Sequence, residues 1–199
     1  MRKPNDTRLK LLQTALDLFW EKSYGSVSVD DICACCGVNK GSFYYAFKSK
    51  SELSIAALEH YWAHSCRPSF DAIFSDQVPP LERLQTYCQT IANSQLAKYQ
   101  KTGKICGCPF SSLGCELSTQ DDPVREKIQE IAARTIKYIA GAVRDAIEEN
   151  LIKPRVSAGE IAKQVYCYVV GCVMQSRIEN NSDSLTNLKA GVFRILDTA

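Results

Sequence analysis

The chain of 199 residues lacks the features of membrane, exported and repetitive proteins. Its longest apolar stretch, Val165 to Met174, has only 10 residues, whereas a helix needs about 20 to cross a bilayer. The N-terminal segment MRKPNDTRLKLL is basic but lacks the apolar run and the cleavage site of a signal peptide. Internal repeats and low-complexity tracts are also absent. We therefore expect a soluble, cytoplasmic protein without a membrane partner.

Neither cysteine nor charge of one sign dominates the composition. Ten cysteines are about 5% of the chain, below the roughly 8–10% of disulfide scaffolds, so free thiols are expected. The net charge is only +2. Residues 1–50, however, hold eight lysines and arginines, including Arg2 and Lys3, against five acidic residues. The N-terminal quarter is therefore where a site for a polyanion is expected.

No segment alternates apolar and polar residues as a half-buried strand does, and almost every segment has helical periodicity. The sequence predicts an all-α fold of about nine helices. The first, at about residues 7–22, places Leu9, Leu12, Leu16 and Phe19 on one face. The others are expected at about residues 28–36, 39–47, 49–66, 79–99, from 109 for a short distance, 122–150, 158–179 and 184–196. Ser28 with Asp31, Ser49 with Glu52, and Ser157 with Glu160 have the spacing of capping boxes.

Residues 26–53 are the most informative segment. Two short helices meet at a tight turn at Gly37, and no acidic residue lies between Gly37 and Lys50. This layout predicts a helix-turn-helix, whose second helix enters the major groove of DNA. Phe43 and Phe47 are expected to anchor its inner face, and Gly41 allows its N-terminus to approach a phosphate closely. The residues expected to contact DNA are Ser28, Asn39, Lys40, Gly41, Ser42, Tyr44, Tyr45, Lys48 and Lys50.

This segment resembles the signature of the TetR family of bacterial transcriptional regulators. The matching residues are Gly37, Val38, Asn39, Gly41, Ser42, Phe43, Tyr44, Phe47 and Lys50, and the motif covers about residues 9–58. The resemblance implies that Ser28, Tyr44 and Lys50 touch phosphates and that the start of the second helix reads bases. Beyond the motif, only the order and lengths of the helices resemble the family's dimerising effector domain.

We expect a DNA-binding domain at residues 1–50 and an effector-binding and dimerisation domain at residues 51–199. The helices at 158–179 and 184–196 are apolar enough to predict a homodimer through them. The alternative is that both helices face an internal core. Such a dimer would bind double-stranded DNA at a near-palindromic operator, with half-sites roughly 34–36 Å apart or a multiple of that.

Two groups of residues invite a metal-binding interpretation. The chain has Cys33, Cys35 and Cys36 where the family usually has alanine, and the favoured interpretation is packing, because cysteine behaves as a small hydrophobe. His60, His64 and Cys66 lie on one side of a predicted helix, but no further ligand is near them in sequence. The sequence therefore predicts no metal and no cofactor.

A cysteine loop precedes the helix that begins at Pro109. Cys108 is at the expected N-cap, where the helix dipole and nearby Lys101 and Lys104 favour a thiolate. Cys106 is placed to resolve an oxidised Cys108, and Cys115 is expected on the same helix face as Cys108. The loop also resembles that of TetR-like repressors that sense electrophiles and oxidants. The alternative is a cysteine that only packs beside the ligand cavity.

The function predicted from the sequence is a transcriptional repressor released from its operator by a small-molecule effector or by modification of a reactive cysteine. In the resembled family, the pocket-lining helices correspond to those carrying Tyr87, Phe110, Tyr138, Tyr166 and Tyr168, which are either ligand contacts or core. One alternative is a regulator with an ordinary apolar ligand and inert cysteines. Another is a thiol oxidoreductase using Cys106 and Cys108, but the chain has no strands for a thioredoxin-like sheet. An enzyme is therefore not expected.

Overall fold

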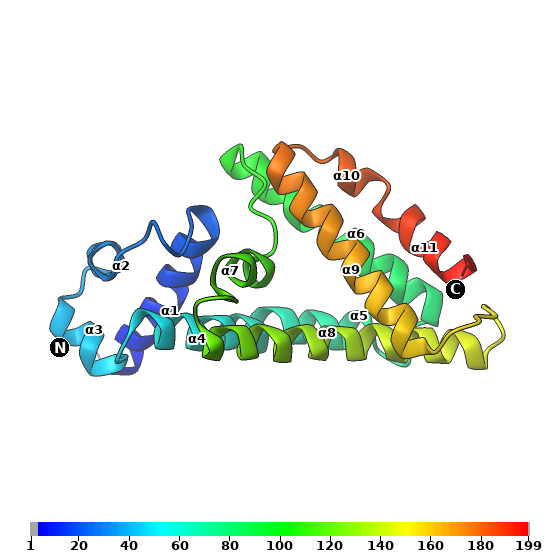
Figure 1. Ribbon diagram of the computed structural model, residues 1–199, viewed down its shortest axis with the longest axis horizontal. Coiled ribbons are helices and arrows are strands. Elements are labelled where there is room, and N and C mark those ends of the chain that lie inside the picture. Colours follow the sequence, from blue (N-terminus) through cyan, green and yellow to red (C-terminus); the bar gives the residue numbers. More distant parts are fainter. Residues whose placement is uncertain (1–3, 199) are drawn as a thin grey trace. The chain divides into compact units, whose positions relative to one another are not determined.

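The computed structural model describes residues 4–198, and every regular element within them is a helix, which confirms the predicted all-α class (Figure 1). In chain order the elements are α1 (Pro4–Glu21), α2 (Val29–Cys36), α3 (Lys40–Ala46), α4 (Lys50–Tyr61), the π-helical turn η1 (Trp62–Cys66), α5 (Arg67–Ile73), α6 (Pro80–Thr102), α7 (Pro109–Leu117), α8 (Asp122–Glu148), α9 (Ala158–Glu179), α10 (Asp183–Thr186) and α11 (Leu188–Thr198). Arg2 and Lys3 lie outside the described residues. None of the described helices is both long enough and apolar enough to cross a membrane.

Two predicted helices differ from those in the structure. The helix predicted for residues 49–66 leaves α-helical geometry after Tyr61, passes through η1 and continues into α5, which the sequence did not predict. Pro68 has no amide hydrogen and its ring disfavours a regular α-helix before it, and the wider π turn accommodates it. The helix predicted for residues 184–196 is interrupted at Asn187, which separates α10 from α11.

The chain forms two compact units. The first comprises the residues up to Cys66 together with Pro109–Ile131, and the second comprises Arg67–Cys108 and the residues from Ala132 onward. The chain therefore leaves the first unit after η1 and returns to it for α7 and the start of α8. The functional boundary at residue 50 stays a prediction.

In the first unit, α1 packs against both α2 and α4. Leu12, Leu16 and Phe19 are buried as predicted, but Leu9 is 41% exposed and Leu11 is fully buried instead. Because two helices cover α1, its buried surface is wider than one stripe and is turned away from Leu9.

Caps fix the starts of α4 and α9. Ser49 Oγ accepts a hydrogen bond from the Glu52 amide at 3.0 Å, but the Glu52 carboxylate accepts from the Lys48 amide at 2.7 Å. The predicted capping box at α4 is therefore only half formed. At α9, Ser157 Oγ accepts from the Glu160 amide at 3.2 Å.

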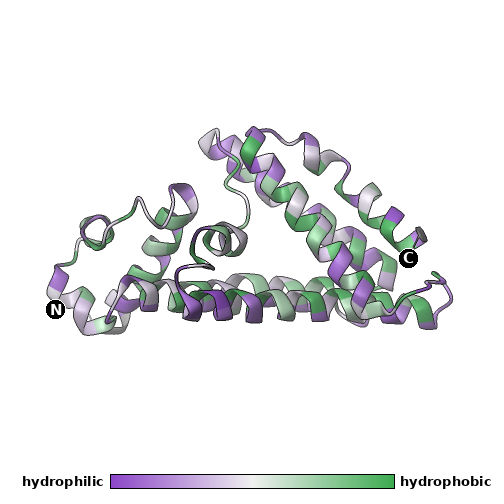
Figure 2. Cartoon of the chain, viewed as in Figure 1, coloured by the Kyte–Doolittle hydropathy of each residue, from purple (hydrophilic) through white to green (hydrophobic). Residues whose placement is uncertain are grey.

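The second unit has an apolar core formed by α6, α8, α9, α10 and α11. Figure 2 shows hydrophobic residues along α9. The residues of α9 that are buried in this core are Ile161, Ala162, Val165, Val169 and Val173. Helices α9 and α11 pack closely: a Cβ added at Gly191 would overlap the Tyr168 ring and its hydroxyl oxygen. Along α8, Thr135, Ile139 and Val143 are buried in the second unit, whereas Ile131 is buried and Ile128 partly buried in the first.

Candidate DNA-binding surface and cysteine loop

Helices α2 and α3 are joined by the tight turn that the sequence predicts. Gly37 ends α2 in the left-handed conformation (φ +62°), which glycine adopts without strain. At the other end of α2, Ser28 and Asp31 form a complete capping box, with the Ser28 amide donating to Asp31 at 2.8 Å and the Asp31 amide donating to Ser28 Oγ at 3.1 Å. Asn39 caps α3 by accepting a hydrogen bond from the Ser42 amide at 2.8 Å. These contacts give the two short helices definite ends.

One face of α3 is anchored and the other is exposed. The rings of Phe43 and Phe47 are buried, with centroids 6.3 Å apart. On the outer face, Tyr44 is 56% exposed and Tyr45 is 85% exposed. The exposed set also includes Asn39, Lys40, Gly41 and Lys48, while Ser42 is half-buried. Six of the nine predicted DNA contacts therefore lie open to solvent on α3 and the residues flanking it.

The lysine that begins α3 is already paired. Lys40 Nζ lies 2.8 Å from Asp30 Oδ1 on α2, and both side chains are largely exposed. This hydrogen bond to the carboxylate raises the pKa of Lys40. A DNA phosphate at this position would have to compete with Asp30.

Lys50, predicted from the sequence to contact phosphate, is turned inward. Its ammonium donates hydrogen bonds to the carbonyls of Tyr24 at 2.9 Å and Val27 at 2.8 Å, and it lies 3.9 Å from the centre of the Tyr24 ring. Burial lowers the pKa of Lys50, an effect opposed by the nearby charge of Glu116. Two of its three protons are therefore engaged with backbone carbonyls, and its contact with phosphate stays a prediction.

Glu116 is a residue that the sequence reasoning missed. It lies on α7, yet its carboxylate accepts hydrogen bonds from the amides of Tyr24, at 2.9 Å, and Gly25, at 2.6 Å. More than 90 residues separate these partners in the chain. No local sequence signal links them, because the contact depends on the return of the chain to the first unit.

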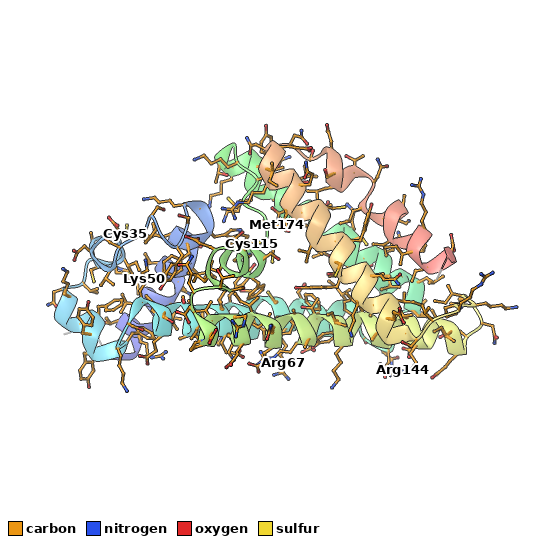
Figure 3. The ribbon with its side chains drawn as sticks, in the orientation of Figure 1. Cys35, Lys50, Arg67, Cys115, Arg144 and Met174 are labelled. Carbon is orange, nitrogen blue, oxygen red and sulfur yellow. The ribbon has the colours of Figure 1, made fainter. Side chains whose placement is uncertain are left out.

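The three cysteines of α2 have different environments. Cys33 and Cys36 are buried, as the packing interpretation predicts, and the Cys36 thiol lies 3.7 Å from the Lys10 carbonyl oxygen. Cys35 is exposed, which corrects the expectation that all three occupy small buried sites (Figure 3). Its position on α2 turns it away from the contacts with α1.

The histidines on α4 and η1 contact each other. The rings of His60 and His64 have centroids 4.1 Å apart, and His64 Nδ1 lies 2.9 Å from the His60 carbonyl oxygen. Desolvation lowers the pKa of His60, and the nearby charges of His64 and Arg8 add to this effect. Across the described residues, no three side chains of the metal-ligating types are grouped so that they could hold an ion.

The cysteine loop of the second unit is held by side chains from α6 and from the end of α9. The buried Gln95 side chain accepts from the Gly107 amide at 3.1 Å and donates to the Gly107 carbonyl at 3.2 Å. Arg177 donates to the carbonyl of Cys106 at 2.9 Å, and Asn180 accepts from the amide of Ile105 at 2.9 Å. The loop is therefore fixed by paired backbone groups at three successive residues.

The cysteines near this loop differ in accessibility. Cys106 is buried, whereas Cys108 is half-buried against the apolar core, directly before α7. Cys115 lies exposed on α7, in the first unit (Figure 3). Its predicted face relation with Cys108 stays a prediction.

The predicted pocket aromatics divide between the two units. In the second unit, Tyr87 is buried among Phe70 and Phe74, with ring centroids 5.7 and 5.6 Å away. Tyr138 packs on the same two rings and its hydroxyl donates to Asp71. Burial raises the pKa of Tyr166 to about 12, with a smaller effect from the nearby Cys108. Phe110 belongs to the first unit, where it packs on Tyr61 at 5.8 Å.

A pocket of about 260 Å³ lies between α6 and the segment α10–α11, and none of the predicted aromatic residues lines it. Its lining consists of Cys88, Gln89, Ala92, Leu96, Ser182, Leu185, Thr186, Leu188 and Lys189. The Cys88 thiol is almost completely buried, and this burial raises its pKa to about 12.

A capped, anchored second helix with an exposed outer face, joined to a separate helical unit, defines a helix-turn-helix DNA-binding regulator. Residues 11–57 match the profile described as bacterial regulatory proteins of the tetR family, and residues 80–192 match that of the tetracyclin repressor-like C-terminal domain. The chain belongs to the TetR family of transcriptional regulators.

Similar proteins cover nearly the whole chain. The transcriptional repressor DhaR of Mycobacterium sp. (strain GP1) is 26% identical over 95% of this chain and 91% of its own length. The transcriptional repressor NemR of Escherichia coli K12 is 24% identical over 98% of this chain and 96% of its own length. The crystal structure of reduced E. coli NemR superposes with a TM-score of 0.82 at 23% identity, covering 96% of this chain and 98% of that one. A TetR-family regulator from Agrobacterium tumefaciens gives a TM-score of 0.85 at 17% identity, covering 98% and 100%.

Proposed function

We propose that this protein is a transcriptional repressor that binds a near-palindromic DNA operator as a homodimer and leaves it when an effector occupies or modifies the second unit. The observation that carries the proposal is α3: its inner rings are buried and its N-terminus is capped, while Tyr44 and Tyr45 project to solvent. The names of DhaR and NemR support repression rather than activation. In this proposal, residues 1–50 bind DNA and residues 51–199 bind the effector and the second subunit.

The roles proposed on DNA follow from exposure and chemistry. Lys40 begins α3, where a recognition helix meets base edges, and Gly41 allows close approach to the backbone. Tyr45 projects to solvent from the last turn of α3 and is proposed to reach base edges from there. Tyr44, Ser28 and Lys48 are proposed to contact phosphates or sugars, which fix the register of the protein on the duplex. Asn39 and Ser42 are proposed to approach DNA beside the helix N-terminus, where Asn39 also serves as the cap.

We propose that the dimer forms through α9 and the α10–α11 segment. Ile178, near the end of α9, is 74% exposed, and Val170 and Met174 on the same helix are only partly buried. Ile195 on α11 is also only partly buried. An apolar surface of this kind is stabilised by burial against a second copy. The dimer would place two α3 helices in successive major grooves, about 34–36 Å apart.

The proposed release step involves the pocket aromatics of the second unit or the thiol of Cys108. An electrophile would form a carbon–sulfur bond with Cys108 while the thiol proton passes to solvent, and the added group would press on Tyr87 and Tyr166. A change of about 4 kcal/mol in the balance between two arrangements weakens DNA binding roughly a thousandfold.

The DNA-binding part is tested by fluorescence anisotropy with duplexes from the region beside the gene. Tyr45→Ala should weaken binding to the duplex that the wild type binds most tightly at least about tenfold, since the substitution removes a large contact from α3. Tyr99→Ala is the matched control, because Tyr99 is 40% exposed but lies on α6. Failure of the wild type to bind any duplex at low ionic strength, or equal binding by both variants, would overturn the proposal.

The proposed release through Cys108 is tested in a protein that lacks Cys35. Cys35 is exposed on α2, and its modification would block DNA binding directly. In Cys35→Ser protein, brief treatment with N-ethylmaleimide should release the operator, and adding Cys108→Ser should abolish the release. Cys115→Ser should leave the release intact. Release that persists in the Cys35→Ser, Cys108→Ser protein removes Cys108 as the sensing thiol. No release in the Cys35→Ser protein itself removes thiol sensing and favours a regulator with an ordinary apolar ligand.

A further inference from the structure

The turn between α1 and α2 is held by an anion from α7. Glu116 Oε2 accepts from the Tyr24 amide at 2.9 Å, and Glu116 Oε1 accepts from the Gly25 amide at 2.6 Å. A carboxylate bound by two backbone N–H groups forms strong, charge-assisted hydrogen bonds. A Cβ added at Gly25 would lie only 3.0 Å from Glu116 Oε1, so the absence of a side chain permits this close approach.

The carbonyls of the same turn are held by a cation from α4. Lys50 donates to the carbonyls of Tyr24 and Val27 and lies against the Tyr24 ring. The turn is therefore bound at its amides by Glu116 and at its carbonyls by Lys50. We refer to Glu116, Lys50 and residues 24–27 as the turn clamp.

Residues 24–27 of the turn clamp lie immediately before the two helices proposed to bind DNA, α2 and α3. Val27 is buried and is followed by Ser28, the N-cap of α2, and α2 leads through Gly37 into α3. The backbone position of residues 24–27 therefore sets where α2 begins. A shift of the turn would move the start of α2, which leads through Gly37 into α3.

We propose that Glu116 is a positioning residue for operator binding: its carboxylate fixes the turn before α2 and so holds α3 in the arrangement that reads DNA. This inference rests on the proposed function, because it assigns Glu116 a part in the same DNA contact. The inference also assigns a role to α7, the helix that directly follows Cys108 in the chain.

Charge and positioning predict opposite results for removal of Glu116. A negative charge in a DNA-binding unit repels phosphates, so its loss alone should tighten binding and do so equally for all sequences. Loss of positioning should instead weaken operator binding while sequence-independent binding to phosphates remains. The ratio of operator affinity to non-specific affinity separates the two effects, and global unfolding would lower both affinities together.

The experiment compares full-length Glu116→Ala and Glu116→Gln with Glu126→Gln, which removes the same charge from an exposed position on α8. Affinities are measured for the operator and for a scrambled duplex of equal length, and hydrogen exchange is followed at the Tyr24 and Gly25 amides. Glu116→Ala should lower the affinity ratio at least about tenfold and speed exchange at both amides. Glu116→Gln keeps an oxygen acceptor and should fall between Glu116→Ala and the wild type.

Gly25→Ala provides a second test that leaves Glu116 in place. The added methyl group should push the carboxylate away from the turn and lower the same ratio, but it should have no further effect in the Glu116→Ala background. Equal ratios for Glu116→Ala, Glu126→Gln and the wild type, with faster amide exchange in the first, would overturn the inference and leave the proposed function intact. Failure of the wild type to discriminate the operator would instead overturn the proposed function.

Discussion

At the scale of single residues, the structure separates side chains that face solvent from those that serve the fold. Tyr44 and Tyr45 have the exposure that a DNA contact requires, whereas Lys50 is engaged with the carbonyls of Tyr24 and Val27. Both kinds of residue belong to the same motif in the sequence. Only the direction of each side chain distinguishes them.

The pairing of Lys40 with Asp30 gives a prediction at this scale. Asp30→Asn frees the Lys40 ammonium and removes a charge that repels phosphates, so DNA affinity should rise several-fold. The slope of log affinity against log salt should steepen by about one, since one more phosphate is neutralised. Anisotropy titrations from 50 to 200 mM salt give both values. Glu21→Gln removes the same charge from α1 and is the control; identical slopes in the two variants would contradict the pairing argument.

At the scale of elements, short helices depend on their caps. Helix α3 has only 7 residues, too few for stability in isolation, and it is held by the Asn39 cap and the buried rings of Phe43 and Phe47. Helix α2 depends likewise on its capping box and on Gly37. These signals are local, which explains why the sequence predicted both helices correctly.

The Asn39 cap gives the second prediction. Asn39→Ala should destabilise the protein by about 1 kcal/mol and weaken operator binding, because the start of α3 frays. Ser157→Ala removes a cap of the same kind from α9 and should cost similar stability without changing DNA affinity. Urea unfolding and anisotropy measure the two effects. Asn39→Ser keeps a capping oxygen: if it restores stability but not affinity, Asn39 itself contacts DNA, and if it restores both, Asn39 acts only as a cap.

The break between α10 and α11 and the π turn before α5 are element-scale features that periodicity did not predict. Apolar spacing continues across both places, so the pattern alone extends each helix. The π turn precedes Pro68, whose missing amide hydrogen and ring are not part of an apolar pattern, and the break between α10 and α11 falls at Asn187.

At the scale of the whole molecule, the core of the second unit buries groups that ionise at alkaline pH. Burial raises the pKa of Tyr87, and it raises those of Cys88 and Tyr166 to about 12 each. Because the folded state favours the protonated forms, their contribution to stability is complete below the unfolded values near pH 9–10. It is lost as the pH rises toward 12.

The third prediction follows from this linkage. The free energy of unfolding should fall between pH 10 and 12, and in Tyr166→Phe it should fall less, by on the order of 1 kcal/mol after allowance for partial exposure. Urea unfolding at pH 8, 10, 11 and 12 provides the comparison. Parallel curves for the two proteins would show that Tyr166 ionises equally in the folded and unfolded states.

The sequence by itself determined the all-α class, the helix-turn-helix and the caps of its helices, because each rests on residues within one or two turns of one another. The tertiary structure alone decided that Lys50 faces the turn after α1, that Cys35 is exposed while Cys33 and Cys36 are buried, and that Glu116 reaches Tyr24 and Gly25. These contacts join residues far apart in the chain, and their geometry depends on how α1, α4 and α7 pack. Periodicity predicts much of the buried face of a helix, with Leu9 on α1 as an exception, but it does not reveal which partner covers that face.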